Sequence, residues 1–298
     1  LGIGFLQTPL GGSKSRGGSR TIGSVLQGIA SGYLRGTPNG IAVDRPSGLV
    51  WSPSHFTWMD TNYPAGTPRQ GYPVEIQVMW IQLLRLLDRA GLEAGGEDWI
   101  GFAAQAAQSF EDRFWLDTEG YCADLIIAEP GQRAEEGIVD SALRSNFPMA
   151  VSTGLVSGDR ARRAVQIALH HLMVPGAVRS LAPRSVAVPL PVHGNDGQVL
   201  NDPKFPYWGR YEGEEETRRK PAYHNGTAWI WPLGILCEAV LEAWEESPEA
   251  VMAVRSYLSG VEGLLNQGCV GHLPEILDGD APHTQRGCDA QAWSVTEV

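Results

Sequence analysis

The sequence predicts an all-α protein in which antiparallel helices stack on one another. Eight segments carry apolar residues at helical spacing, and no segment shows the alternation of strand and helix that a parallel sheet requires. The chain has 298 residues, of which 43% are hydrophobic, so it can bury a sizeable core. Successive helices joined by loops pack as antiparallel neighbours, and we therefore expect one helical stack.

Composition argues against two kinds of partner. The net charge of −11 leaves no basic face for a phosphate backbone, so nucleic acid is not an expected partner. No apolar run approaches the roughly 20 residues that cross a bilayer, and no signal peptide opens the chain, so no membrane partner is expected. The ten tryptophans suit the binding of sugar rings, although core packing explains them equally well.

The four cysteines, Cys122, Cys237, Cys269 and Cys288, are scattered and form no metal-binding pattern with histidines. We therefore expect free thiols in a reducing cytoplasm and no metal. No glycine-rich phosphate loop of the usual kind occurs, and no cofactor is expected. The acidic turn at 278–280 lacks the remaining ligand spacing of a calcium loop.

The first third of the chain holds two predicted helices and a hairpin. Residues 1–20 contain six glycines and are expected to form a loop or a poorly ordered arm, with a single domain at 21–298. The first helix is expected over 21–34, ended by Gly36. Residues 41–51 alternate around a proline-glycine turn, which predicts a small β-hairpin.

The second helix is expected to begin at Pro73, where proline is tolerated, and to end at Gly91. Further helical patterns lie at 98–115, 140–155 (interrupted by Pro148), 159–173, 226–244, 248–266 and 289–298. The proline-rich segment 174–223 has no strand alternation, and so predicts a long loop, which is usually functional or disordered.

Two carboxylates have the surroundings expected of residues in an active site. Asp60 lies between Trp58 and a loop rich in proline and glycine, and its apolar neighbours favour the protonated form of an acid. Glu275 is the best partner, because the loops before alternate helices of a stack open on the same rim. Two loop acids among tryptophans indicate glycoside hydrolysis.

Seven motifs support a family resemblance. They are Thr57-Trp58-Met59-Asp60, Thr67-Pro68-Arg69, Pro73-Val74-Glu75-Ile76, Leu181-Ala182-Pro183, Tyr223-His224-Asn225-Gly226-Thr227-Ala228-Trp229-Ile230-Trp231-Pro232, Glu275-Ile276-Leu277-Asp278-Gly279-Asp280-Ala281-Pro282-His283 and Arg286-Gly287-Cys288-Asp289-Ala290-Gln291-Ala292-Trp293-Ser294-Val295. The motifs occur in this order, and from about Ile22 to the end the chain resembles the amylo-α-1,6-glucosidase domain of glycogen debranching enzymes.

The resemblance implies an (α/α)6 toroid of the glucoamylase-like, six-hairpin type. A full toroid has twelve helices and only about eight are predicted here, so we expect an N-terminally truncated one; the start at Leu1 rather than Met fits a fragment or a processed chain. The resemblance further implies an inverting glucosidase with Asp60 as general acid and Glu275 as general base. Its expected partner is glycogen or limit dextrin, from which it removes α-1,6-linked glucose.

The resemblance and the neighbouring sequence also give candidate substrate contacts. These are Trp58, Arg69, Glu75, Arg144, Asn146, His224, Asn225, Trp229, Trp231, Asp278, Asp280 and His283. Plain core packing is an equal alternative for the tryptophans, and helix capping is one for the His-Asn pair. Arg69 either grips substrate or pairs with Glu75, which also suits the first turn of a helix. The family's Arg-Pro-Asn-Gln stretch is Arg144-Ser145-Asn146-Phe147 here.

Several questions stay open. Glu275 must remain charged beside two aspartates, so we expect Arg286, His283 or backbone donors to offset their repulsion. The loop 174–223, in which Tyr207, Trp208 and Tyr211 could form a lid, leaves a small α-glucoside as an alternative substrate. A truncated toroid that binds glucan without turnover is a further alternative, and the sequence sets no oligomeric state.

Overall fold

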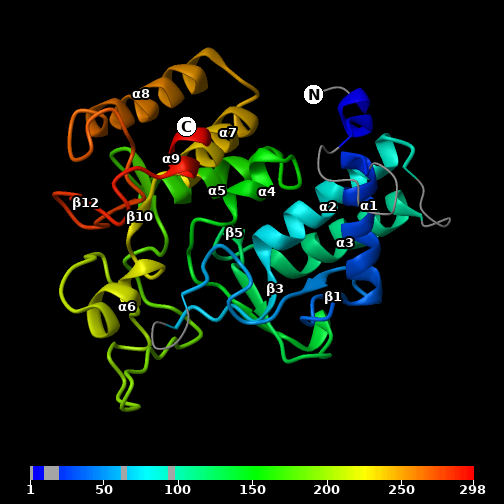
Figure 1. The fold of residues 1–298 in the computed structure, drawn as a ribbon, viewed down its shortest axis with the longest axis horizontal. Coiled ribbons are helices and arrows are strands. Elements are labelled where there is room, and N and C mark those ends of the chain that lie inside the picture. Colours follow the sequence, from blue (N-terminus) through cyan, green and yellow to red (C-terminus); the bar gives the residue numbers. More distant parts are fainter. Residues whose placement is uncertain (1–2, 10–19, 62–65, 93–97) are drawn as a thin grey trace.

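Helices account for most of the regular structure in the computed structural model, which describes residues 3–9, 20–61, 66–92 and 98–298 (Figure 1). They are α1 (Ile22–Arg35), α2 (Val74–Arg89), α3 (Trp99–Phe114), α4 (Pro148–Ser152), α5 (Gly158–His171), α6 (Lys220–Tyr223), α7 (Pro232–Ala243), α8 (Pro248–Leu264) and α9 (Ala292–Thr296), with the shorter turns η1 (Ile3–Gln7), η2 (Ala134–Glu136) and η3 (Glu215–Arg219). Of the arm at 1–20, only η1 and its neighbours belong to the described residues.

The same residues contain short strands, so the expectation of an all-α chain is partly wrong. The strands are β1 (Ala42–Val43), β2 (Val50–Trp51), β3 (Gly71–Pro73), β4 (Trp115–Leu116), β5 (Tyr121–Cys122), β6 (Leu125–Ile127), β7 (Ile138–Asp140), β8 (Met173–Val174), β9 (Ala177–Arg179), β10 (Ala228–Trp229), β11 (Ile276–Leu277) and β12 (Gln285–Arg286). They pair in four small sheets. The fold is therefore helix-rich with small antiparallel sheets.

The first helices follow their sequence signals closely. α1 begins at a capping box in which the Thr21 hydroxyl accepts a hydrogen bond from the Ser24 amide, as expected for a helix N-terminus. α2 follows Pro73 directly, and α3 is capped by the Asp98 carboxylate. β1 and β2 form the predicted hairpin. In Figure 1 these helices gather in one half of the molecule.

The helix expected over 140–155 is mostly wrong. Asp140 ends β7, Arg144 forms a β-bridge with Leu181, and only α4 is helical. Pro148 lacks an N–H and suits the first turn of a helix, while the pairing of β7 with β6 and the bridge of Arg144 to Leu181 hold the residues before it in extended structure. The helix expected from 226 likewise begins only at Pro232, because Ala228–Trp229 is a strand.

The five-stranded sheet gathers distant parts of the chain. Its order is β12-β11-β10-β9-β8, so strands near residues 175, 228 and 280 lie side by side. The segment predicted as a loop over 174–223 contributes β9 at its start, and η3 and α6 at its end. The sheet therefore places the Glu275 loop next to the segment that follows α6.

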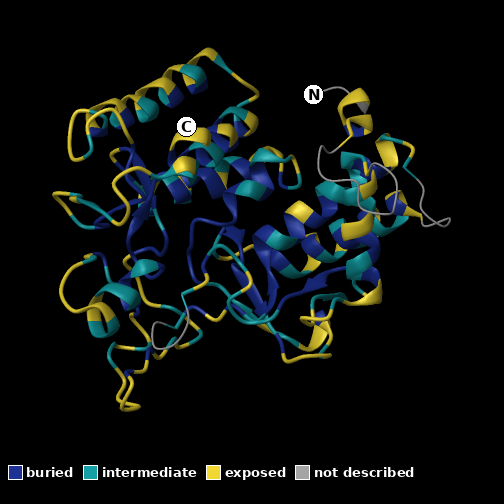
Figure 2. Cartoon of the chain, viewed as in Figure 1, coloured by how far each residue is buried: buried dark blue, intermediate teal, exposed yellow. Residues whose placement is uncertain are grey.

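One hydrophobic core joins both halves of the molecule. Its buried members run from Ala30 in α1 to Leu277 in β11 and include the central faces of α2, α3, α5 and α7 (Figure 2). Buried side chains from neighbouring elements therefore hold the loops of the site on a rigid base. No helix among the described residues is both long and apolar enough to cross a bilayer.

Candidate functional site

Asp60 lies exposed at the edge of an aromatic cluster made by Trp58, His224, Trp229, Trp231 and Trp293. The ring of Trp58 meets that of Trp231 edge-on, with centroids 4.9 Å apart. It meets the Trp229 ring at 5.2 Å in the same manner. Edge-to-face packing fixes the position of the Trp58 ring. The ring in turn limits where Asp60, two residues later, can lie.

The Asp60 loop and the Glu275 loop meet at Tyr223 and His224. The hydroxyl of Thr61, next to Asp60, is hydrogen-bonded to Nδ1 of His224. The Tyr223 hydroxyl donates to Oε1 of Glu275 at 2.6 Å. Because Tyr223 and His224 are consecutive, the two predicted acids belong to loops that contact one short segment.

Glu275 is almost fully buried, with 8% of the residue exposed. Besides Tyr223, the Cys288 amide donates to Oε2 at 3.1 Å and the Gln291 side chain donates to Oε1 at 3.2 Å. A Cβ at Gly287 would come within 2.4 Å of Oε2, so the chain passes close to this carboxylate only because Gly287 has no side chain. Three donors thus hold the carboxylate in one orientation.

Tyr223 stays protonated at physiological pH. Burial, together with its hydrogen bond to Glu275, raises the pKa of the Tyr223 phenol far above its usual value. The hydroxyl therefore remains a donor to the carboxylate. Tyr223, Gln291 and Trp293 were not among the predicted site residues, although all three belong to the motifs that carry the family resemblance.

The three predicted residues beyond Glu275 build the loop itself. Asp278 is fully buried and paired with Arg286 at 3.0 Å, which supplies the offsetting positive charge that the sequence led us to expect. Asp280 accepts a hydrogen bond from the Tyr207 hydroxyl at 2.7 Å. Nδ1 of His283 lies 3.0 Å from the carbonyl oxygen of Asp278.

Segment 207–211 is fastened to this loop. The Tyr211 amide donates to Asp278 at 2.8 Å, and the Gly279 amide donates to the Gly209 carbonyl at 2.6 Å. The Trp208 amide donates to the Asn225 carbonyl at 2.7 Å. Backbone hydrogen bonds of segment 207–211 therefore hold the aromatic residues suggested as a lid against the Glu275 loop.

Arg69 and Glu75 form the bidentate pair that the sequence left as one of two alternatives. Both residues are buried, and Arg69 also donates to Asp124 and to the hydroxyl of Thr57 at 3.0 Å. Its N–H groups are thus engaged with the protein. Because Thr57 lies three residues before Asp60, the Arg69–Glu75 pair helps to position the Asp60 loop.

Asp124, which the sequence reasoning missed, accepts a hydrogen bond from Asn146 at 2.7 Å and lies 3.7 Å from Arg144. Asn146 in turn accepts from the indole N–H of Trp58 at 2.7 Å. An acid inside the apolar run 121–127 was a usable signal, because a buried carboxylate needs a partner.

Arg144 connects this network to the other loop. It donates to the His224 carbonyl at 2.6 Å and to the Asn225 side chain at 2.9 Å. Asn225 also donates to the Pro221 carbonyl at 3.0 Å. The predicted polar residues from 69 to 225 therefore form one buried network beneath the aromatic cluster.

His224 carries no charge near neutral pH. Burial, reinforced by the positive charges of Arg144 and Arg69, lowers the pKa of His224 well below its usual value. Its Nε2 atom, and the indole N–H groups of Trp231 and Trp293, are buried without a hydrogen-bond partner among the described residues. The aromatic cluster thus contains three polar atoms that are not hydrogen-bonded to any described residue.

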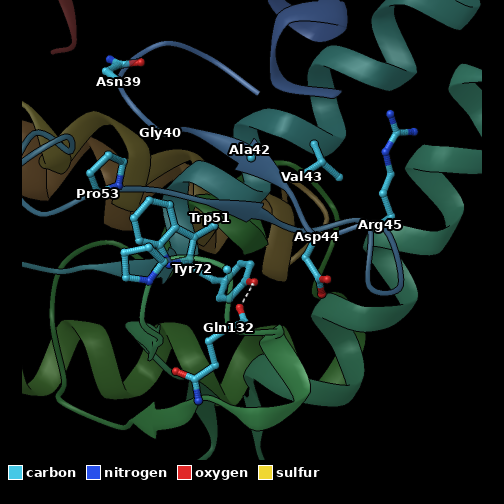
Figure 3. A pocket seen from close by; sticks show the side chains of 12 residues that line it. Asn39, Gly40, Ala42, Val43, Asp44, Arg45, Trp51, Pro53, Tyr72 and Gln132 are labelled. Carbon is cyan, nitrogen blue, oxygen red and sulfur yellow. Dashed lines mark hydrogen bonds between the residues drawn. The ribbon is translucent and has the colours of Figure 1, made fainter. Parts of the chain in front are cut away.

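The cavities of the molecule differ in how much of this site they include. One of about 430 Å³ is lined by Trp51, Tyr72 and Asp44, with the Tyr72 hydroxyl bonded to the carbonyl of Gln132 (Figure 3). It includes none of the predicted site residues. Within the described part of the chain, no group of three or more His, Cys, Asp or Glu side chains could hold a metal ion.

The Asp60 and Glu275 loops both contact the Tyr223–His224 segment, and a pair of carboxylic acids is the equipment that glycoside hydrolases use. The chain belongs to the amylo-alpha-1,6-glucosidase family, whose sequence profile matches residues 13–298.

Among solved structures, the chain is similar to the GH63 mannosylglycerate hydrolase from Thermus thermophilus in complex with Tris and D-glycerate, with 12% identity, a TM-score of 0.47, and coverage of 75% of this chain and 44% of that one. The complex of that enzyme with Tris gives 15% identity, a TM-score of 0.44, and 75% and 43% coverage. An uncharacterized conserved protein from the same organism gives 14% identity, a TM-score of 0.47, and coverage of 75% of this chain and 44% of that one. This chain thus spans less than half the length of each.

Proposed function

We propose that this chain is the catalytic region of an inverting glycoside hydrolase that removes α-1,6-linked glucose from a branched α-glucan, on a toroid of the (α/α)6 type. The observation that carries the proposal is the contact of both acid loops with the Tyr223–His224 segment. Family membership supports the same reaction class. The four free cysteines fit action in a reducing cytoplasm.

In this mechanism Asp60 protonates the glycosidic oxygen while Glu275 removes a proton from the attacking water. Inversion requires a separation of roughly 6.5–9.5 Å between the two carboxyls, which leaves room for that water. Glu275 is suited to the base, because three donors fix its orientation. Asp60 is assigned as the acid because its side chain is exposed to an incoming substrate and no described residue is hydrogen-bonded to its carboxyl group.

The first test replaces each acid by its amide and measures glucose release from limit dextrin. We expect Asp60→Asn and Glu275→Gln each to lower kcat by at least about 100-fold, because each removes one proton-transfer group. Asp88→Asn is the matched control, since Asp88 is exposed on α2, away from both loops. Full activity in either active-site variant would refute the assignment.

The stereochemical outcome is a separate test. Proton NMR of the first product formed identifies its anomer before mutarotation, and an inverting enzyme releases β-glucose from an α-linkage. Release of α-glucose would show retention and exclude Glu275 as a general base that acts through water.

A small α-glucoside is a second candidate substrate. It is favoured by the hydrogen bonds that hold segment 207–211 to the Glu275 loop. A panel of glucosides of increasing chain length separates the two candidates. A value of kcat/KM that falls steeply with chain length favours the small substrate.

A further inference from the structure

The Glu275 carboxylate has no cation paired with it among the described residues. It is nearly buried, and burial favours the protonated form of a carboxylic acid, which cannot act as a base. Arg286, on the neighbouring strand β12, is paired with Asp278 instead. In the described part of the chain, the groups that can stabilise a charge on Glu275 are therefore neutral hydrogen-bond donors.

Two of these neutral donors reach the same oxygen. The Tyr223 hydroxyl donates to Oε1 at 2.6 Å and the Gln291 side chain donates to it at 3.2 Å, whereas the Cys288 amide donates to Oε2. A carboxylate oxygen has two lone pairs, so these two donors fully engage Oε1. Hydrogen bonds to a charged carboxylate are short and strong, and the Tyr223 bond is the shortest of the three. Tyr223 is therefore the main donor.

Other contacts hold both donors in place. The Tyr223 carbonyl accepts from the indole N–H of Trp229 at 3.0 Å, and the two rings pack with their centroids 4.9 Å apart. The Gln291 amide donates to the Leu273 carbonyl at 2.9 Å. Both side chains thus start from anchored backbone, which presents their donors to the carboxylate in a defined place.

The remaining titratable or charged groups around Glu275 come from every element packed near it. They are Tyr211 of segment 207–211, Glu212, Glu215 and Arg219 in and before η3, His224 after α6, Asp278 and Arg286 around the β11–β12 hairpin, and Cys288 before α9. All of them stay unchanged in variants of Tyr223 or Gln291. A shift in the titration of Glu275 in such a variant therefore reports the lost donor.

We propose that Tyr223 and Gln291 are positioning residues, whose hydrogen bonds to Oε1 keep the Glu275 carboxylate charged and in one orientation. Tyr223 has the larger share, because its hydrogen bond is the shorter. That the oriented carboxylate acts as a base rests on the proposed function, whereas the stabilisation of its charge does not.

Carbon-13 NMR of the full 298-residue chain, labelled at the side-chain carboxyl carbon of glutamate, follows the protonation of Glu275 directly. The signal that disappears in Glu275→Gln belongs to this residue. We expect Tyr223→Phe to raise the pH of half-protonation by about one unit, because a hydrogen bond to the charged form is lost while the ring stays. Gln291→Leu is expected to raise it by about half a unit.

Activity gives a second readout. The acid limb of kcat/KM for glucose release from limit dextrin reports the base of the free enzyme. We expect this limb to move to higher pH by the same amount as the NMR titration in each variant. A loss of structure alone would lower kcat/KM at every pH without moving the limb.

Tyr72→Phe is the matched control. It also removes a tyrosine hydroxyl, bonded to the Gln132 carbonyl at 2.7 Å in the cavity that includes no predicted site residue (Figure 3). We expect it to move neither the Glu275 signal nor the acid limb. Urea unfolding of Tyr72→Phe and Tyr223→Phe shows whether the two variants lose similar stability. If Tyr223→Phe folds poorly, Gln291→Leu provides the same test at the same oxygen.

The outcomes separate this inference from the proposed function. A Glu275 signal that titrates as in the wild-type chain in both Tyr223→Phe and Gln291→Leu would overturn the inference alone. A shifted signal with an unmoved acid limb would overturn the positioning role in catalysis. Full activity of Glu275→Gln would refute the proposed function, and with it that role, whichever way the signal moves.

Discussion

Arg69 shows how one side chain sets the position of a loop. Its guanidinium group reaches Glu75 in α2, Asp124 before β6 and the Thr57 hydroxyl, all of them away from bulk water. Only a planar fork with five N–H groups can serve these partners together. Arg144 lies 3.7 Å from Asp124 and supplies the second positive charge, and the burial of the network depends on every member.

We expect Arg69→Lys to lower the free energy of unfolding by about 3 kcal/mol, because a lysine leaves buried carboxylate oxygens without donors. Urea unfolding measures this change. Arg133→Lys is the control, since the pair of Arg133 and Glu135 is more than half exposed and should change stability by less than about 0.5 kcal/mol. Equal effects in the two variants would contradict a structural role for the Arg69 network.

His224 makes the stability depend on pH. The folded protein keeps His224 neutral where the unfolded chain, with a pKa of about 6.5, takes up a proton. Stability from this group is therefore complete above that pH and is lost as the pH falls below it, by about 1.4 kcal/mol per pH unit. We expect His224→Gln to reduce the slope of unfolding free energy between pH 6.5 and 5, relative to the wild-type chain.

The control for that measurement is His193→Gln, because His193 is exposed and should leave the slope unchanged. Acid-sensitive carboxylates contribute equally to all three proteins, so the difference between slopes isolates His224. A slope that is the same in the His224 variant would mean that the imidazole is protonated in the fold.

The turn at Gly226, just before β10, determines how closely β10 and segment 207–211 approach each other. Gly226 has a φ of +153°, and a Cβ at this position would lie 2.6 Å from the backbone of Trp208. Its amide donates to the Ser180 hydroxyl at 3.0 Å. The strand and segment 207–211 can therefore approach closely only because residue 226 has no side chain.

We expect Gly226→Ala to lower the free energy of unfolding by about 3 kcal/mol and to loosen segment 207–211, because backbone strain and a clash add together. Chemical denaturation and limited proteolysis within that segment report the two effects. Gly28→Ala is the control: Gly28 lies inside α1 with open space around it, so alanine should stabilise by about 0.5–1 kcal/mol. A neutral Gly226→Ala would show that Trp208 moves freely.

Elements with strong local signals were predictable. The α1 capping box, Pro73 before α2 and the Asp98 cap of α3 each act within a few residues, and the three helices begin where these signals predict. Residues 140–147 and 226–231 were assigned to helices because their apolar spacing was ambiguous. Long-range pairing made parts of both segments extended, with β10 between β9 and β11.

For the whole molecule, the sequence by itself determined the helix-rich class, the order of the motifs and the family, because these depend on residue type and local spacing. Only the tertiary structure decided that Arg69 pairs with both Glu75 and Asp124, and that Thr61 and Glu275 contact the neighbouring residues His224 and Tyr223. It also decided that Tyr223 and Gln291 reach one oxygen of Glu275. The physical reason is that hydrogen bonds and buried charges join residues far apart in the chain, and no local pattern specifies which distant partner will satisfy them.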